Sequence, residues 1–164
     1  MKESVKKPDL KLRLVADTDL AIFYEHQLDP EANWMAAFTA KDPTDRLAFD
    51  THWAKVLADP GITIRTILVD GQVAGSVLCH GWGGEAELSY WLGRDFWGRG
   101  IATQAVRLFL DLVHVRPLIA RVARDNTASI RVLEKIGFEQ SGEGKWFSNA
   151  RGMEIDELVW ALRI

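Results

Sequence analysis

Two closely spaced glycines, Gly98 and Gly100, separate an apolar segment that ends at Leu92 from a helix predicted to start near Ile101. Glycine lets the backbone approach a ligand closely, and the first N–H groups of a helix have no intrahelical partner. Those donors point outward at the positive end of the helix dipole, where a phosphate or pyrophosphate fits. Glycines at this place are also compatible with a plain turn before a helix.

Two common phosphate-binding motifs do not match this stretch. A P-loop ends in Gly-Lys-Ser/Thr, and no such ending follows Gly100. A dinucleotide fingerprint has a third small residue where this chain has Thr103, and no open βαβ unit begins here. An anion site at these glycines would therefore be of another kind.

Two motifs resemble the GNAT N-acetyltransferases. The run Trp97-Gly98-Arg99-Gly100-Ile101-Ala102 is similar to the coenzyme A pyrophosphate loop of that family, Gln/Arg-x-x-Gly-x-Gly/Ala. Trp97 stands in the Gln/Arg place, as is usual in the RimJ/RimL-like branch. The segment 126–138 resembles the second signature of that branch, Asn-x-x-Ser followed by a helix and Gly-Phe. The resemblance covers nearly the whole chain loosely and is specific over about residues 90–138.

The resemblance implies acetyl-CoA as co-substrate. Its pyrophosphate would bind the loop amides with Arg99 adding charge, and its pantetheine arm would pair with the strand before the loop. That strand and its neighbour would splay apart, because the ligand satisfies backbone groups that are otherwise costly to bury. The residues expected to bind the co-substrate are Tyr90, Leu92, Gly98, Arg99, Gly100, Ile101, Ala102, Thr103, Asn126 and Ser129.

Direct attack of a neutral amine on the thioester needs a base and a donor that polarises the carbonyl. A backbone N–H near Leu92 is the family-like donor. Glu85 and Glu87 are the candidate bases, since alternation places both on one face of the strand, although such carboxylates are usually only solvated. His80, at the end of the neighbouring strand, is a further candidate.

The leaving thiolate needs an acid. Many GNAT enzymes use a tyrosine in the second-signature helix, but the matching residue here is Leu133. RimJ/RimL-like members instead place a serine near the sulfur, which corresponds to Ser129. Ser129 and Asn126 are also compatible with an ordinary first turn and cap, but a thiolate is stabilised at a helix N-terminus.

The composition is that of a globular protein, and residues 1–164 are expected to form one domain with residues 1–8 flexible. No apolar run approaches the roughly 20 residues that span a bilayer, and no signal-peptide core is visible. We therefore expect a cytoplasmic protein without membrane contact. The net charge of −3 provides no general attraction to nucleic acid.

The lone cysteine, Cys79, excludes an intrachain disulfide and is expected to be a small buried filler. It forms no metal-ligand spacing with His26, His52 or His114, so no metal site is expected.

The order of predicted elements indicates an α+β fold, the GNAT fold, with a mixed, mostly antiparallel, splayed sheet and helices on both faces. Alternation and turn residues predict strands at 10–14, 63–69, 72–80, 85–92, 118–122, around 142–144 and at 156–162. Periodicity and caps predict helices at about 17–27, 42–59, 100–116 and 126–137. The side chains of residues 17–19 are expected to cap the first of these helices, and Asp29-Pro30 to end it.

Three details of this arrangement bear on the site. The segment 10–14 is expected at or near a sheet edge, and Gly75 predicts a bulge or a close neighbour. The helix between 85–92 and 118–122 predicts that these two strands are parallel. The sequence of residues 31–40 is compatible with either a helix or a loop over a pocket.

Three functions compete. The first is an N-acetyltransferase that acts on a primary amine, either a protein N-terminus or a small molecule. The second is a non-catalytic acyl-CoA sensor, motivated by the missing tyrosine, and the third is an interaction module on the same scaffold. Exposed final strands would allow a homodimer.

Overall fold

The computed structural model describes residues 7–164, so residues 1–6 of the stretch predicted to be flexible lie outside the described residues. One seven-stranded sheet runs through these residues in the order β1-β2-β3-β4-β5-β7-β6. Its strands are β1 (Leu10–Arg13), β2 (Thr63–Val69), β3 (Gln72–His80), β4 (Glu87–Leu92), β5 (Leu118–Ala123), β6 (Glu139–Ser148) and β7 (Met153–Leu162). The helices are α1 (Asp19–Gln27), α2 (Pro30–Ala36), α3 (Arg46–Ala58), α4 (Ile101–Leu110) and α5 (Thr127–Ile136), with a 3-10 turn, η1 (Arg94–Phe96).

Neighbouring strands pair antiparallel except β4 and β5, which are parallel as predicted. The register of that parallel pair contains only Glu87↔Ile119, so the two strands diverge beyond Glu87. β1 lies at one edge of the sheet, also as predicted. The expected α+β fold with a mixed, mostly antiparallel and splayed sheet is confirmed.

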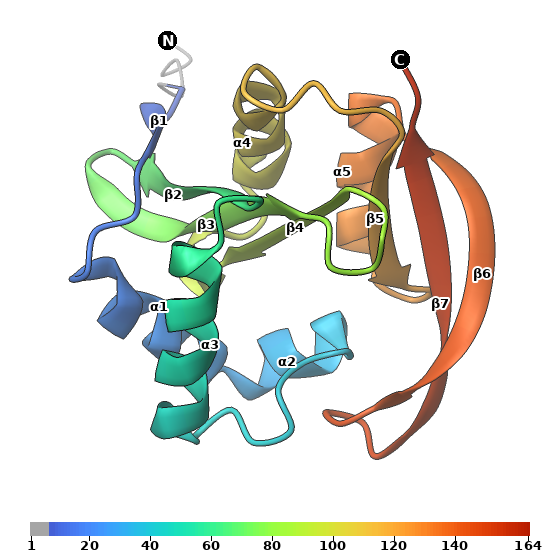
Figure 1. Ribbon diagram of the computed structural model, residues 1–164, viewed down its shortest axis with the longest axis horizontal. Helices are drawn as coiled ribbons and strands as arrows, with labels where there is room; N and C mark the ends of the chain where they lie inside the picture. The colour runs from blue at the N-terminus through green and yellow to red at the C-terminus, as the bar shows by residue number, and fades with distance from the viewer. Residues whose placement is uncertain (1–6) are drawn as a thin grey trace, which may run out of the picture.

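Helices cover both faces of the sheet (Figure 1). α4 and α5 pack on one face over the larger core, to which they contribute Ile101, Phe109 and Leu133. α1 and α3 pack on the other face through a second cluster that includes Phe23 and Trp53. α2 lies on that second face, close to β5.

Two predicted helix ends are wrong. α3 begins at Arg46 rather than near residue 42, because the Asp45 side chain accepts the capping bond from the Ala48 N–H at 3.0 Å. Asp42 instead closes a local turn with the Thr44 N–H. α4 ends at Leu110 rather than near residue 116. The next N–H groups, of Asp111 and Leu112, bond to carbonyls three residues back (Leu108 and Phe109), which tightens the chain and ends the helix although Val113 is still buried.

The bulge predicted at Gly75 is present and brings β3 close against β4. Ile67 pairs with Gly75 and Leu68 with Val73, so β3 has an extra residue between them. A Cβ atom on Gly75 would lie 1.9 Å from the carbonyl oxygen of Trp91. A side chain here would push β4 out of place, at the strand that precedes the glycine loop.

Asp19 connects β1, α1 and β2. The prediction that the side chains of residues 17–19 cap α1 is wrong, because no side chain caps its N-terminus. The Asp19 carboxylate is buried and accepts hydrogen bonds from the Arg13 guanidinium (2.6 and 2.9 Å), the Ala16 N–H (2.9 Å) and the Thr66 hydroxyl (2.7 Å). Burial raises the pKa of this carboxyl, but the hydrogen bonds outweigh burial and lower it to about 2.

We expect Asp19→Asn to destabilise the fold by about 2 kcal/mol at neutral pH. The folded pKa lies below the unfolded one, so the carboxylate stabilises the fold above about pH 4 and loses this contribution as the pH falls toward 2. Urea unfolding across this range should therefore show the difference between wild type and variant shrinking in acid. Asp17→Asn, at an exposed position, is the matched control. If the difference in unfolding free energy between wild type and Asp19→Asn did not change with pH, the lowered pKa of Asp19 would be contradicted.

Candidate active site

The gap between β4 and β5 leaves backbone groups of β4 without a strand partner. The Ala86 carbonyl bonds toward β5 and the Gly93 N–H bonds toward β3. Because backbone groups alternate in direction along a strand, the N–H and C=O of Tyr90 and Leu92 face β5. The register with β5 has ended before both residues. A ligand that entered the gap could pair with them as a strand would.

The side chain of Trp97 forms a hydrogen bond with one of these backbone groups. Its indole N–H donates to the Leu92 carbonyl at 3.0 Å and folds the loop back against the end of β4. The sequence showed Trp97 as a departure from the Gln/Arg place but gave no sign of this bond. The N–H of Leu92 and both backbone groups of Tyr90 then remain for a ligand.

The glycine loop follows directly. Gly98 and Gly100 have φ of +69° and +72°, the left-handed region that favours glycine, and Gly100 begins α4 without a side-chain cap. The first helical bond runs from the Gln104 N–H to the Gly100 carbonyl. Within residues 7–164, the backbone N–H groups of residues 98–103 donate no hydrogen bond. A second set of free donors therefore lies at the helix N-terminus, separated from the β4 gap by the paired N–H groups of Gly93, Phe96 and Trp97.

Tyr90 and Ser129 meet on the opposite side of β4 from α1. Their hydroxyl oxygens lie 2.7 Å apart. Ser129 is in the first turn of α5, where its N–H donates to the Asn126 side chain at 3.3 Å, so the predicted cap is confirmed. Burial raises the pKa of the Tyr90 phenol, more than its hydrogen bond with Ser129 lowers it, so this group is neutral at physiological pH.

The side chain of Tyr90 is a functional feature that sequence reasoning missed. Alternation placed it on an apolar face, and its backbone alone was expected to bind a ligand. A tyrosine hydroxyl in an apolar setting needs a hydrogen-bond partner, which was the available signal. Leu133, which stands in the place of the usual tyrosine, is 1% exposed and belongs to the core.

Of the two predicted carboxylates, only Glu87 lies on β4. Glu85 is exposed in the bend before the strand, so the prediction that both share one strand face is wrong. The turn from β3 extends over residues 81–86, which leaves Glu85 outside the pleat. Both oxygens of Glu87 have partners, Arg121 Nε at 2.8 Å and His80 Nε2 at 2.9 Å. Arg121 continues to the buried Glu157 at 3.3 Å.

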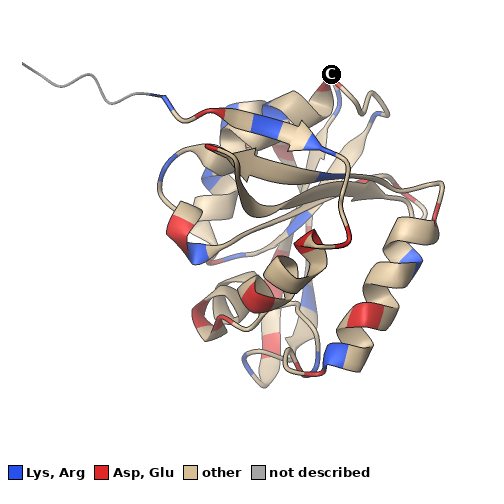
Figure 2. Cartoon of the chain, turned by 90° about the vertical axis from the view of Figure 1, so that its left-hand side faces the viewer, with Lys and Arg blue, Asp and Glu red and all other residues tan. Residues whose placement is uncertain are grey.

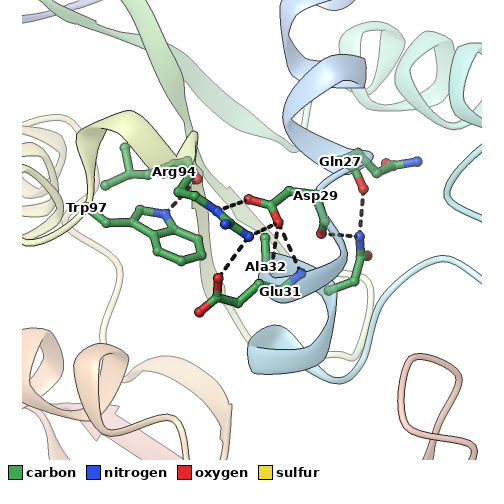
Figure 3. A network of polar contacts seen from close by, with 8 residues as sticks. Gln27, Asp29, Glu31, Ala32, Arg94 and Trp97 are labelled. Carbon is green, nitrogen blue, oxygen red and sulfur yellow. Dashed lines mark hydrogen bonds and ion pairs between the residues drawn. The ribbon is translucent and has the colours of Figure 1, made fainter.

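α2 is tethered to the end of β4 by Arg94 (Figure 3). The guanidinium of Arg94 bonds both oxygens of Asp29 and pairs with Glu31 at 2.9 Å. Asp29 also caps α2, since it accepts from the Glu31 and Ala32 N–H groups at 3.0 and 3.4 Å. Asp29 was predicted only to end α1, and its pairing with Arg94 lowers the pKa of the carboxyl.

The other end of α2 is tied to the turn between β6 and β7. The Ser148 hydroxyl donates to the Ala37 carbonyl at 2.6 Å, and the Arg151 side chain donates to the Trp34 carbonyl at 2.9 Å. Arg151 also pairs with Asp125 at 2.7 Å, directly before the cap of α5. α2 thus connects the β4 side of the gap with the β5 side.

A cavity of about 180 Å³ lies between α1, α3 and the face of β3 and β4 that α4 and α5 leave free. Tyr90 and Trp91 border it, so it adjoins the part of β4 that faces the gap. A second cavity of about 190 Å³, beside Arg94 and Asp29, shares His26 with the first.

Charged residues of both signs are interspersed over the elements seen in Figure 2. No cluster of three or more His, Cys, Asp or Glu side chains in residues 7–164 could hold a metal ion. None of the helices in that range is long and apolar enough to cross a bilayer.

The family described as the acetyltransferase (GNAT) domain matches residues 9–139. The putative ribosomal N-acetyltransferase YdaF of Bacillus subtilis (strain 168) is 29% identical over 136 residues, which cover 76% of this chain and 74% of that protein. An uncharacterized N-acetyltransferase, p20, of Bacillus licheniformis is 34% identical over 83 residues, or 48% of this chain and only 47% of that relative. RimJ of Mycobacterium smegmatis, solved with CoA-disulfide, has a TM-score of 0.77 at 25% identity over 94% of this chain and 81% of that chain.

The chain belongs to the GNAT acetyltransferase family. The resemblance to its RimJ/RimL-like branch is confirmed by these relatives. The description of this family and the names of these relatives agree with the predicted class of N-acetyltransferase.

We expect Arg94→Ala to loosen α2 without disturbing the core. The guanidinium of Arg94 is exposed, so solvent screens the pair with Asp29 and its effect should stay local to α2. Hydrogen exchange of the α2 amides should therefore become several-fold faster, while exchange in α4 and α5 stays unchanged. Arg99→Ala, which removes a nearby exposed guanidinium, is the control. Equal protection of α2 in both variants would show that the tether contributes nothing.

Proposed function

We propose that this protein transfers the acetyl group of acetyl-CoA to a primary amine by direct attack within a ternary complex. The observation that carries the proposal is the row of unpaired backbone donors formed by Tyr90 and Leu92 on β4 and, beyond the paired N–H groups of Gly93, Phe96 and Trp97, by residues 98–103. Its two halves match the two parts of the ligand, since an amide-bearing arm fits an unpaired strand edge and a diphosphate fits a helix N-terminus. The similar structure of RimJ was solved in complex with CoA-disulfide, which supports a CoA ligand for this fold.

The residues that would hold acetyl-CoA follow from this row. Backbone amides of Gly98, Gly100, Ile101, Ala102 and Thr103 receive the diphosphate, with the exposed Arg99 guanidinium nearby. Tyr90 pairs with the pantetheine amides through its N–H and C=O, Leu92 offers only its N–H because Trp97 holds its carbonyl, and Asn126 caps the first turn of α5.

The thioester supplies the activated acetyl group. The amine nitrogen bonds to the acetyl carbon and loses a proton, while the C–S bond breaks and the sulfur keeps the electron pair and gains a proton. The Leu92 N–H lies where it can donate to the carbonyl oxygen. Glu87 is the candidate that receives the amine's proton, through a water, because both of its oxygens already have partners. Glu85 stays a candidate only for an acceptor that reaches the exposed bend.

Ser129 is the group proposed to donate to the sulfur. Its partner Tyr90 has the more acidic hydroxyl, so Tyr90 donates to Ser129 and leaves the serine hydrogen free for another acceptor. The Tyr90 phenol stays neutral, so it can orient Ser129 by donating this hydrogen bond. The N-terminus of α5 adds a favourable field for a thiolate.

The function is tested by incubating the purified protein with acetyl-CoA and a panel of primary amines while free thiol is measured. Thermal unfolding with acetyl-CoA reports binding separately, since ligand at one hundred times Kd stabilises by about 2.7 kcal/mol. Turnover of an amine supports the proposal. Stabilisation without turnover of any amine would favour the non-catalytic sensor, and no stabilisation would contradict acetyl-CoA binding.

We predict that Gly100→Ala raises the KM for acetyl-CoA by about tenfold, equivalent to about 1.4 kcal/mol. Alanine is strained at φ of +72° by about 1 kcal/mol, and relief of the strain would turn the loop donors away from the diphosphate. Gly152→Ala is the matched control, because Gly152 has φ of +67° in open space at the β6–β7 turn. Both variants should lose similar stability, and only the first should lose affinity. Equal KM values would contradict the loop assignment.

A double-mutant cycle tests the pair of hydroxyls. Ser129→Ala should lower kcat by about 10- to 100-fold, the worth of a hydrogen bond to a charged group, with the KM for acetyl-CoA unchanged. Tyr90→Phe should lower kcat by about tenfold. If Tyr90 acts only through Ser129, the double variant should be no slower than Ser129→Ala alone. Fully additive losses would show that Tyr90 acts independently of Ser129.

A further inference from the structure

The cavity between α1, α3 and the sheet has the size of one aromatic ring. Its volume is about 180 Å³, and an engineered cavity of about 150 Å³ in another protein binds benzene. The cavity is partly open to solvent, so a ligand can enter it from outside.

The lining of this cavity is aromatic and uncharged. Phe23, Phe49, Trp53 and Trp91 supply ring surfaces, and none of the lining residues is an Asp, Glu, Lys or Arg. The polar members include His26 and His52, and burial lowers the pKa of both imidazoles, so both are neutral at physiological pH. A second positive charge on a ligand would find no carboxylate here.

Two buried polar atoms on the lining residues lack a partner within residues 7–164. They are Nδ1 of His26 and the indole N–H of Trp91. Both atoms are buried beneath the surface of the cavity, so recognition of a ligand rests on the ring surfaces rather than on these two groups.

The cavity also borders the part of β4 where the acetyl transfer is proposed to take place. Ser89, Tyr90 and Trp91 of β4 border it, and the backbone of Tyr90 faces the gap proposed to hold the pantetheine arm. A ligand whose aromatic ring binds in the cavity can therefore reach the gap with an amine at the end of a short chain.

We propose that the acceptor is a primary amine that carries an aromatic ring, that the ring binds in this cavity, and that the acceptor bears no second positive charge. This rests on the proposed acetyltransferase function and specifies its acceptor. The ring can belong to a free arylalkylamine or to the first residue of a peptide.

The test compares kcat/KM for 2-phenylethylamine, spermidine and 2-aminoethanol, and for peptides that begin with phenylalanine or serine. We expect the aromatic member of at least one set to be preferred by tenfold or more. The set that shows the preference identifies the source of the amine. Similar kcat/KM values for aromatic and non-aromatic acceptors in both sets would overturn the proposal while leaving the acetyltransferase function in place.

Ser89→Leu tests whether the ring binds in this cavity. Leucine at this position of the lining fills part of the space, so kcat/KM for the preferred aromatic acceptor should fall by about tenfold with the KM for acetyl-CoA unchanged. Thr51→Leu makes the same kind of change at an exposed position of α3 outside the lining and should have no effect. Equal kcat/KM in the two variants would overturn the proposal.

Calorimetric binding of 2-phenylethylamine in the presence of CoA gives a readout that needs no turnover. Binding that Ser89→Leu weakens, in a protein that acetylates no amine, would support the cavity as an aromatic site and reject the proposed function. Absence of binding by wild type, together with turnover of spermidine, would reject the aromatic acceptor alone.

Discussion

The separation of β5 from β4 is the constraint on which the rest of the structure depends. The two strands share one register pair, whereas β3 and β4 share six and β5 and β7 share six. Each side of the gap is therefore anchored by its own antiparallel partner, so the strands can diverge without unravelling either half of the sheet. The cost is a set of β4 backbone groups that no strand satisfies, which would destabilise the fold if they stayed buried and unpaired.

Several neighbouring features keep this gap from closing. The bulge at Gly75 lets β3 approach the Trp91 carbonyl and sets the direction in which β4 ends. Trp97 then takes the Leu92 carbonyl and turns the chain into the glycine loop. On the other face, α2 is held by Arg94 at one end and by the β6–β7 turn at the other. A helix fixed at both ends acts as a spacer between the two halves of the sheet.

Features of the fold that depend on residues adjacent in the sequence were predicted correctly, whereas features that depend on tertiary contacts were not. Asn126 caps α5 and Gly137 ends it with φ of +112°, because caps and left-handed glycines depend on adjacent residues alone. Asp19 was assigned to a cap for the same reason, but its partners Arg13 and Thr66 come from two strands that only the fold brings together. Glu85 was misplaced because alternation cannot locate the residue at which a strand begins.

Tyr90 shows how one residue can serve both halves of the proposed site. Its backbone lies at the unpaired edge of β4, and its side chain reaches Ser129 on α5. Periodicity predicted the first property, since backbone direction follows from strand position, but not the second, which depends on where α5 packs. The loss of the usual tyrosine at Leu133 therefore does not remove a phenol from the site. In the proposed site the phenol comes from the strand rather than from the helix, and burial keeps it neutral beside the serine hydroxyl.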